Sequence, residues 1–157
     1  MSDTRYGQPP VTALEPRPYP NVSGVLGSRL FAWFIDIVVL FFLGWLVVLL
    51  LSVLGIVTFG ATWALIPIAT VATALGYAAL TIGGRRQSTW GMRVAGLRVE
   101  TAEGGRPDGL SAAVHALLFY VAAGTFLLWL VDVACGFARA DRRMGHDLLT
   151  GLVVVRA

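Results

Sequence analysis

Four charged side chains stand inside or beside long apolar runs, and they are the groups in this sequence best placed to do chemistry. Arg29 opens the longest apolar run, and Asp36 follows seven residues later within it. Seven residues make nearly two helical turns, so a helix would place both side chains on nearly the same face, about 10.5 Å apart along its axis. Asp132 lies near the end of a later apolar run, and Asp147 follows in a short amphipathic stretch. A carboxylate at the centre of a membrane helix costs roughly 2.5–3.5 kcal/mol, so each acid needs a partner, a raised pKa or a water-filled cavity.

Three roles for these charges are open. They can form ion pairs that fix the register of the helices, they can relay protons or cations, as acids within membranes often do, or they can recognise the helix of a partner protein. We expect Asp147 to reach Arg29 at the mouth of the first helix. Asp132 is expected to reach Arg139 or Arg142 if the third apolar segment turns back on itself, and to lie toward the opposite interface if that segment crosses.

The composition indicates the class of protein. Of 157 residues, 57% are hydrophobic and 13% are charged, whereas soluble domains typically carry about 25% charged residues. We therefore expect an integral membrane protein whose main surroundings are a lipid bilayer. The net charge is +3 and every basic residue is an arginine. Because the arginines flank the apolar runs, they favour anchoring at the membrane surface, and no nucleic-acid partner is expected.

The chain divides into a short tail and one domain. Residues 1–27 hold five of the seven prolines and few large apolar side chains, which predicts a disordered cytoplasmic tail. Residues 28–157 are expected to form a single membrane domain. The tail lacks the pattern of a cleaved signal peptide, so the first apolar segment is expected to remain as an anchor.

Three apolar segments set the expected fold class, an all-α integral membrane protein. Residues 29–54 and 62–82 are each long enough to cross a bilayer core of about 30 Å, and their short link predicts a transmembrane two-helix hairpin. The third segment, residues 111–137, contains Ala122-Ala123-Gly124-Thr125 at its middle, where a bend is possible. This segment either crosses once or forms a re-entrant helical hairpin.

The arginines favour the re-entrant alternative. The loop of residues 83–110 carries five arginines and the segment after residue 137 carries four; the proposed cytoplasmic anchors among them are Arg85, Arg86, Arg139, Arg142 and Arg143. The positive-inside rule places both regions in the cytoplasm together with the N-terminus, which one crossing by the third segment would prevent. Residues 92–100 and 151–156 resemble strands, and we expect them to pair as a small cytoplasmic β-pair.

No side chain carries an evident catalytic function. Ser28 and Ser88 have no neighbouring base in the sequence to activate them. His115 and His146 are far apart and Cys135 is alone, so neither a metal site nor another cofactor is expected. The sequence therefore favours a non-enzymatic protein.

An arginine that opens the first helix, an aspartate within it and a late aspartate followed by Leu-Leu-Thr-Gly resemble the RDD family of small membrane proteins. The family is named for an arginine and two aspartates, which correspond to Arg29, Asp36 and Asp147. The resemblance covers residues 24–156. It implies a multi-pass protein of the bacterial cytoplasmic membrane with no settled activity, although cation/proton exchange has been suggested for some members.

A second motif supports the resemblance. The loop segment Ser88-Thr-Trp-Gly-Met-Arg-Val-Ala-Gly-Leu-Arg-Val99 resembles the family's usual TPGKRLLGLRV. Trp90 stands where proline is common and Met92 where lysine is common, while Leu152 replaces a usual threonine in the last motif. These departures lie outside the charged triad.

The sequence therefore leads us to expect one of two functions. The first is an accessory or assembly subunit of a larger membrane complex, in which Arg29, Asp36 and Asp147 form an ionic core. The second is an oligomeric cation/proton exchanger, or another small-solute transporter, in which Asp36 titrates. Three or four short membrane segments are too few to enclose a pathway for a solute. Both functions therefore require association with another membrane protein or with further copies of this chain.

Overall fold

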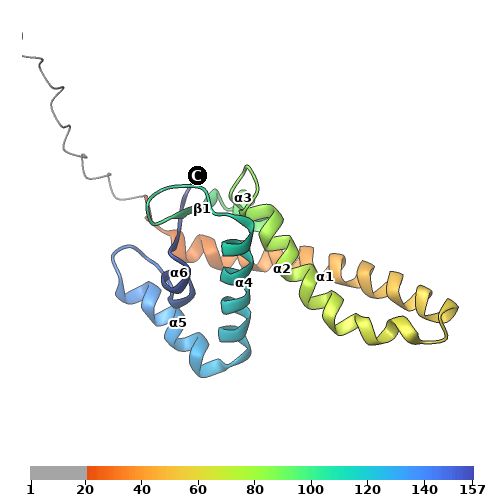
Figure 1. Ribbon diagram of the computed structural model, residues 1–157. Helices are drawn as coiled ribbons and strands as arrows, with labels where there is room; N and C mark the ends of the chain where they lie inside the picture. The colour runs from red at the N-terminus through yellow and green to blue at the C-terminus, as the bar shows by residue number, and fades with distance from the viewer. Residues whose placement is uncertain (1–20) are drawn as a thin grey trace, which may run out of the picture.

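The fold begins with a long antiparallel helical hairpin (Figure 1). A computed structural model describes residues 21–157, so most of the predicted tail, residues 1–20, lies outside the described residues. Helix α1 runs from Val25 to Val57, and a 3₁₀ turn, η1 (Ala61–Leu65), leads into α2 (Ile66–Ile82). The predicted two-helix hairpin is confirmed. Its first helix begins at Val25, earlier than the predicted domain boundary at residue 28.

The third apolar segment forms a second helical hairpin. Helices α4 (Gly109–Gly124) and α5 (Phe126–Ala138) are separated by Thr125, whose backbone is extended. The break follows from a glycine and a β-branched residue in succession, since both have low helix propensity. The two helices have 16 and 13 residues, or about 24 and 20 Å at 1.5 Å per residue, and each is shorter than a bilayer core.

Two strands pair as predicted. Strand β1 (Leu97–Thr101) is antiparallel to β2 (Leu152–Arg156), with Leu97 opposite Arg156 and Thr101 opposite Leu152. Because β1 precedes α4 and β2 follows α5, this pairing brings the start and the end of the second hairpin back to one place. The third apolar segment is therefore a hairpin of two helices instead of one continuous helix.

The first predicted strand is shorter than expected, because its opening residues are helical. Residues Trp90–Val94 form α3. Thr89 caps this helix, since its Oγ1 accepts a hydrogen bond from the N–H of Met92 at 3.1 Å. Gly96 has a φ of +65°, which suits glycine and turns the chain from α3 into β1. The strand predicted for residues 92–94 from the alternation of apolar and polar side chains is therefore wrong.

The hydrophobic core lies at one end of the molecule. It forms where the start of α1, the end of α2, the start of α4, the last helix α6 (Gly145–Thr150) and the strands meet. Its buried members are Val25, Ala32, Ala78, Ile82, Leu97, Val99, Ala112, Ala116, Leu152 and Val154. We call this end the base of the fold.

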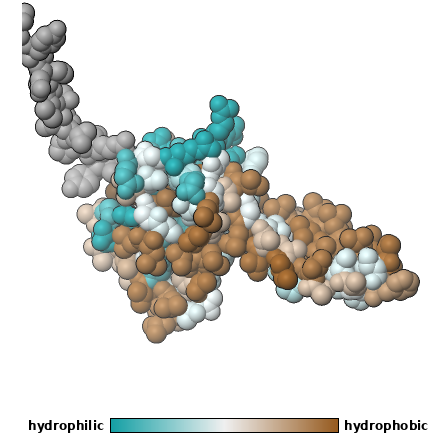
Figure 2. Space-filling view, in the orientation of Figure 1, coloured by the Kyte–Doolittle hydropathy of each residue, from teal (hydrophilic) through white to brown (hydrophobic). Residues whose placement is uncertain are grey.

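Beyond the base, large apolar side chains cover the outside of both hairpins. Figure 2 shows hydrophobic residues over these hairpins and hydrophilic residues gathered around the base. On α1, Phe42 is 63% exposed, and Phe59 at the tip of the first hairpin is 99% exposed. Folded soluble proteins rarely expose apolar surface of this extent. Two helices, Val25–Val57 and Ala61–Ile82, are long and apolar enough to cross a membrane.

Candidate functional site: a buried ionic network and a separate Asp36 site

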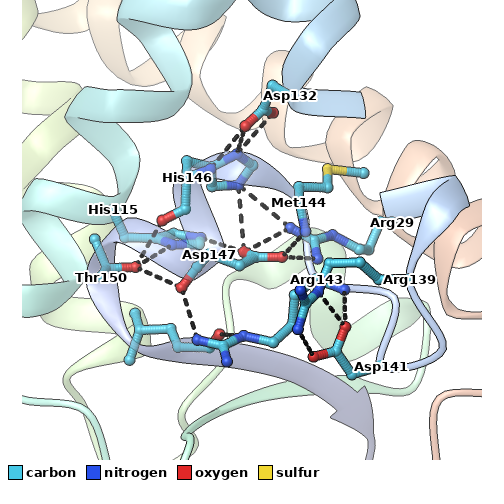
Figure 3. Close-up of polar contacts among 11 residues, drawn as sticks. Arg29, His115, Asp132, Arg139, Asp141, Arg143, Met144, His146, Asp147 and Thr150 are labelled. Carbon is cyan, nitrogen blue, oxygen red and sulfur yellow. Dashed lines mark hydrogen bonds and ion pairs between the residues drawn. The ribbon is translucent and has the colours of Figure 1, made fainter. Parts of the chain in front are cut away.

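The centre of the candidate site is a buried ion pair between the first and the last helix (Figure 3). Arg29, near the start of α1, donates to Asp147 of α6 through both terminal nitrogens, with Nη1 2.5 Å from Oδ2 and Nη2 2.9 Å from Oδ1. Asp147 is fully buried and Arg29 is 9% exposed. The planar guanidinium matches both carboxylate oxygens at once, which gives this pair strength and a fixed geometry. The predicted contact between Arg29 and Asp147 is confirmed.

Asp147 also organises the helix that carries it. It lies in the first turn of α6, where Oδ2 accepts a hydrogen bond from the N–H of Met144 at 2.8 Å. Its main-chain oxygen accepts from Nη2 of Arg143 at 3.2 Å, and Nε of Arg143 donates to the carbonyl of Leu152 at 2.9 Å. Arg143 is thus only partly exposed and connects α6 to β2, instead of serving solely as the surface anchor that was predicted.

The electrostatics of Asp147 keep it ionised. Burial alone would raise its pKa, but the charge of Arg29 and its hydrogen bonds outweigh burial and hold the pKa of Asp147 below its usual range. The pair is therefore a cation and an anion at neutral pH. Since Asp147 is fully buried, the loss of Arg29 would leave an uncompensated charge at the base of the fold.

Asp132 of α5 pairs with His146, and not with the predicted arginines. Its Oδ1 accepts from the N–H of His146 at 2.7 Å, and its Oδ2 lies 2.8 Å from Nδ1 of the same residue. Arg139 instead forms a surface pair with Asp141 at 2.8 Å, and Arg142 donates to the carbonyl of Phe137 at 3.1 Å. The reason is that α6 packs back against α5 and delivers His146 to Asp132.

The ring of His146 links two acidic side chains of the network. Its Nδ1 lies 2.8 Å from Oδ2 of Asp132. Its Nε2 lies 3.3 Å from Nη2 of Arg29 and 3.4 Å from Oδ1 of Asp147. His146 therefore connects the Asp132 carboxylate to the Arg29–Asp147 pair.

His115 of α4 completes the network, which corrects the expectation that the two histidines are apart. Its ring centroid lies 4.6 Å from that of His146. Its Nδ1 is 3.3 Å from Oγ1 of Thr150, and its Nε2 is 3.6 Å from Oδ1 of Asp147. The network thus joins α1, α4, α5 and α6. Over residues 21–157, every buried side-chain nitrogen and oxygen has a hydrogen-bond partner.

Three of these residues also have the spacing of a metal site. Ligand atoms of His115, His146 and Asp147 all lie within 4.8 Å of one another. However, the guanidinium of Arg29 already contacts both oxygens of Asp147, so an added cation would meet an existing positive charge at close range. The arrangement therefore fits an ion-paired network better than a metal centre.

Asp36 occupies a different site, contrary to the expected common cluster with Arg29. Its Oδ1 accepts from the hydroxyl of Tyr77 at 2.6 Å and from the N–H of Gly91 at 2.9 Å. Its Oδ2 accepts from the hydroxyl of Thr89 at 2.6 Å. Asp36 therefore fastens the N-terminus of α3 to α1 and α2 through uncharged donors. Arg29 does not reach it, because the guanidinium turns toward α6.

Comparison with protein families decides the identity of the chain, since residues 24–151 match the RDD family. The chain belongs to the RDD family. Neither a curated protein nor a solved structure matches it. In this RDD protein the charged triad separates into two sites: Arg29 and Asp147 pair at the base, while Asp36 binds the loop motif.

Close packing explains a glycine in the RDD loop motif. A Cβ added to Gly91 would lie 2.0 Å from the carbonyl oxygen of Ala32 and 2.9 Å from Cγ of Asp36. Only glycine lets α3 approach α1 closely enough for its N–H to reach Asp36.

Sequence reasoning missed the histidine, tyrosine and threonine partners of the three aspartates. His115 and His146 were read as isolated, and Tyr77 and Thr89 were given no role. A signal existed for two of them: His146 directly precedes Asp147, and Thr89 lies in the loop motif. No comparable pattern marks His115 or Tyr77, which lie within apolar helices and meet their partners only through packing.

Proposed function

We propose that this RDD protein is a non-enzymatic accessory or assembly subunit of a larger membrane complex. The observation that carries the proposal is the closed network, whose charged groups are buried and paired with one another. Such a network stabilises a rigid base and leaves no group of its own free to act on a substrate. The base would hold the apolar α1–α2 hairpin in a fixed position against a partner.

The proposed topology places the base in the cytoplasm of a bacterium, with α1 and α2 crossing the inner membrane. The α4–α5 hairpin would enter and leave from the cytoplasmic side. Support comes from the exposed Arg85, Arg86 and Arg139 near the base, and from residues 55–61 at the hairpin tip, which carry no charge.

Cysteine labelling in cells tests this topology. In a Cys135→Ser background, Arg86→Cys and Arg139→Cys should react with a membrane-impermeant maleimide only after permeabilisation. Phe59→Cys, at the hairpin tip, should react in intact cells. Labelling of positions 86 and 139 from opposite sides would refute the re-entrant hairpin.

The exposed face of α1 is the proposed contact for a partner helix. Phe42 and Trp45 are 63% and 59% exposed there. A tagged protein purified in mild detergent should contain a second membrane protein in fixed stoichiometry. A photo-cross-linking residue at position 42 should capture that protein, whereas one at Phe126, in the tip of the other hairpin, should not. A particle that contains only this chain would contradict the proposal.

A second candidate function rests on Asp36. Its three hydrogen-bond donors within residues 21–157 are uncharged, and acids within membrane segments often mark paths for ions or protons. In liposomes with a pH gradient, an exchanger would lose proton-coupled flux on Asp36→Asn and keep it on Asp108→Asn, which alters an exposed helix cap. Full flux in Asp36→Asn would exclude the relay.

A further inference from the structure

A cleft opens beside Asp36 between α1, α2 and α4. Its volume is about 380 Å³, and its lining includes Asp36 with Trp33 and Phe41 of α1, Ala74 of α2 and Tyr120 of α4. Small-molecule sites typically measure about 300–1,000 Å³ and combine apolar walls with a few polar groups. The cleft has both properties, since most of its lining is apolar and Asp36 is the one charged residue that the described part of the chain contributes to it.

The charge of Asp36 is hydrogen-bonded but not neutralised. An ionised carboxylate offers about four acceptor positions, and three are taken by Tyr77, Thr89 and Gly91. The remaining one is on Oδ2, which has a single partner. Among residues 21–157, no arginine or histidine forms an ion pair with Asp36. A ligand that brings a positive charge to the cleft would complete this site.

The walls decide what kind of cation fits. Trp33, Phe41 and Tyr120 present aromatic rings, which attract cations through their electron-rich faces and also accommodate hydrocarbon. A bare calcium or magnesium ion is a poor match, because each needs several oxygen ligands and the cleft supplies one carboxylate. A phospholipid is also a poor match, because Asp36 would repel its phosphate.

We propose that this cleft binds a hydrophobic organic ammonium ion, with the positive charge against Asp36 and the hydrocarbon part among the aromatic rings. The inference goes beyond both functions proposed above, since neither assembly with a partner nor exchange of small inorganic cations requires this cleft. It rests on the cleft, its unpaired carboxylate and its aromatic lining.

A pair of isosteres tests the role of charge. Benzyltrimethylammonium and its neutral carbon analogue, neopentylbenzene, have nearly the same shape. Calorimetric titration of the purified full-length chain in dodecyl maltoside should show saturable binding of the cation. The neutral analogue should bind about tenfold more weakly or not at all, because it lacks the attraction to a carboxylate. Equal binding of both compounds, or no saturable binding of the cation, would overturn the proposal.

Variants locate the binding to this cleft. Asp36→Asn should weaken binding of benzyltrimethylammonium about tenfold, and Trp33→Leu about three- to tenfold. Trp45→Leu removes an aromatic residue of α1 outside the cleft and should leave the affinity for benzyltrimethylammonium unchanged. Ala74→Phe fills the cleft without touching the carboxylate and should abolish binding, so the test holds even if Asp36→Asn does not fold. Unchanged binding in Ala74→Phe would place the cation elsewhere and refute the site.

Discussion

Replacement of Arg29 by methionine should destabilise this protein far more than replacement of any surface arginine. Methionine keeps much of the length and apolar stem of the side chain but removes the guanidinium. Asp147 would then retain the N–H of Met144, at 2.8 Å, as a direct donor to its carboxylate. The carboxylate is fully buried, so it would keep its charge without a cationic partner or take up a proton.

The expected loss of stability in Arg29→Met follows from the burial of the ion pair. Removal of one partner of a buried ion pair costs about 3–5 kcal/mol. For a domain of this size, about 3 °C of melting temperature corresponds to each kcal/mol, so Arg29→Met should lower the apparent Tm by about 9–15 °C. The matched control is Arg139→Met, because Arg139 pairs with Asp141 at 2.8 Å but is 46% exposed. An exposed pair of this kind contributes about 0–1 kcal/mol.

Thermal loss of the monodisperse size-exclusion peak in detergent provides the assay. The double variant Arg29→Met/Asp147→Asn should be less destabilised than the sum of the two single variants, because the second change removes the stranded charge. If Arg29→Met lowers the apparent Tm by no more than Arg139→Met does, the ion pair does not hold the base together and the reasoning fails.

The same variant should respond to pH in a defined direction. In the native protein, Arg29 holds the pKa of Asp147 below its usual range. The stabilisation is therefore fully present above the unfolded pKa of about 3.9 and is lost as the pH falls through the lower, folded pKa. In Arg29→Met, the strongest influence that opposes burial is lost, and the pKa of Asp147 should rise. Protonation of Asp147 should relieve the penalty. The difference in Tm between variant and native protein should shrink from pH 8 to pH 5, and a constant difference would contradict this account.

Two further predictions concern the Asp36 site, with apparent Tm in detergent as the measurement. Gly91→Ala should destabilise the protein by about 1–3 kcal/mol or more, because its Cβ would lie 2.0 Å from the carbonyl oxygen of Ala32. Gly76→Ala meets nothing within 4 Å and should leave stability unchanged or raise it by up to about 1 kcal/mol; equal effects of the two changes would refute the close approach of α3. Thr89→Val loses both the cap of α3 and the hydrogen bond to Asp36 and should cost about 1–2 kcal/mol, whereas Thr89→Ser should retain most of the stability. If the serine variant is as unstable as the valine variant, the hydroxyl is not what Thr89 contributes.

The two helical hairpins are the part of the fold that the sequence predicts best. Long apolar runs with short links predict membrane hairpins, because the hydrocarbon core dictates the number of residues that can cross it. Gly124 and Thr125 marked the break in the third segment, since both disfavour helix. Residues 92–94 were predicted wrongly because capping by Thr89, a contact three residues away, overrode the alternation of side chains.

The sequence by itself determined that Arg29 and Asp147 need partners, because a charge next to an apolar run is costly when unpaired. It did not determine that Asp36 would bind α3, or that Asp132 would bind His146. Helices that are apolar on all sides carry little information about which face packs against which neighbour. The tertiary structure made that choice: pairing of β1 with β2 and the break at Thr125 fold α6 back onto α1, α4 and α5. Only then do His115, Asp132 and His146, which lie at least 14 residues apart in the chain, join one network.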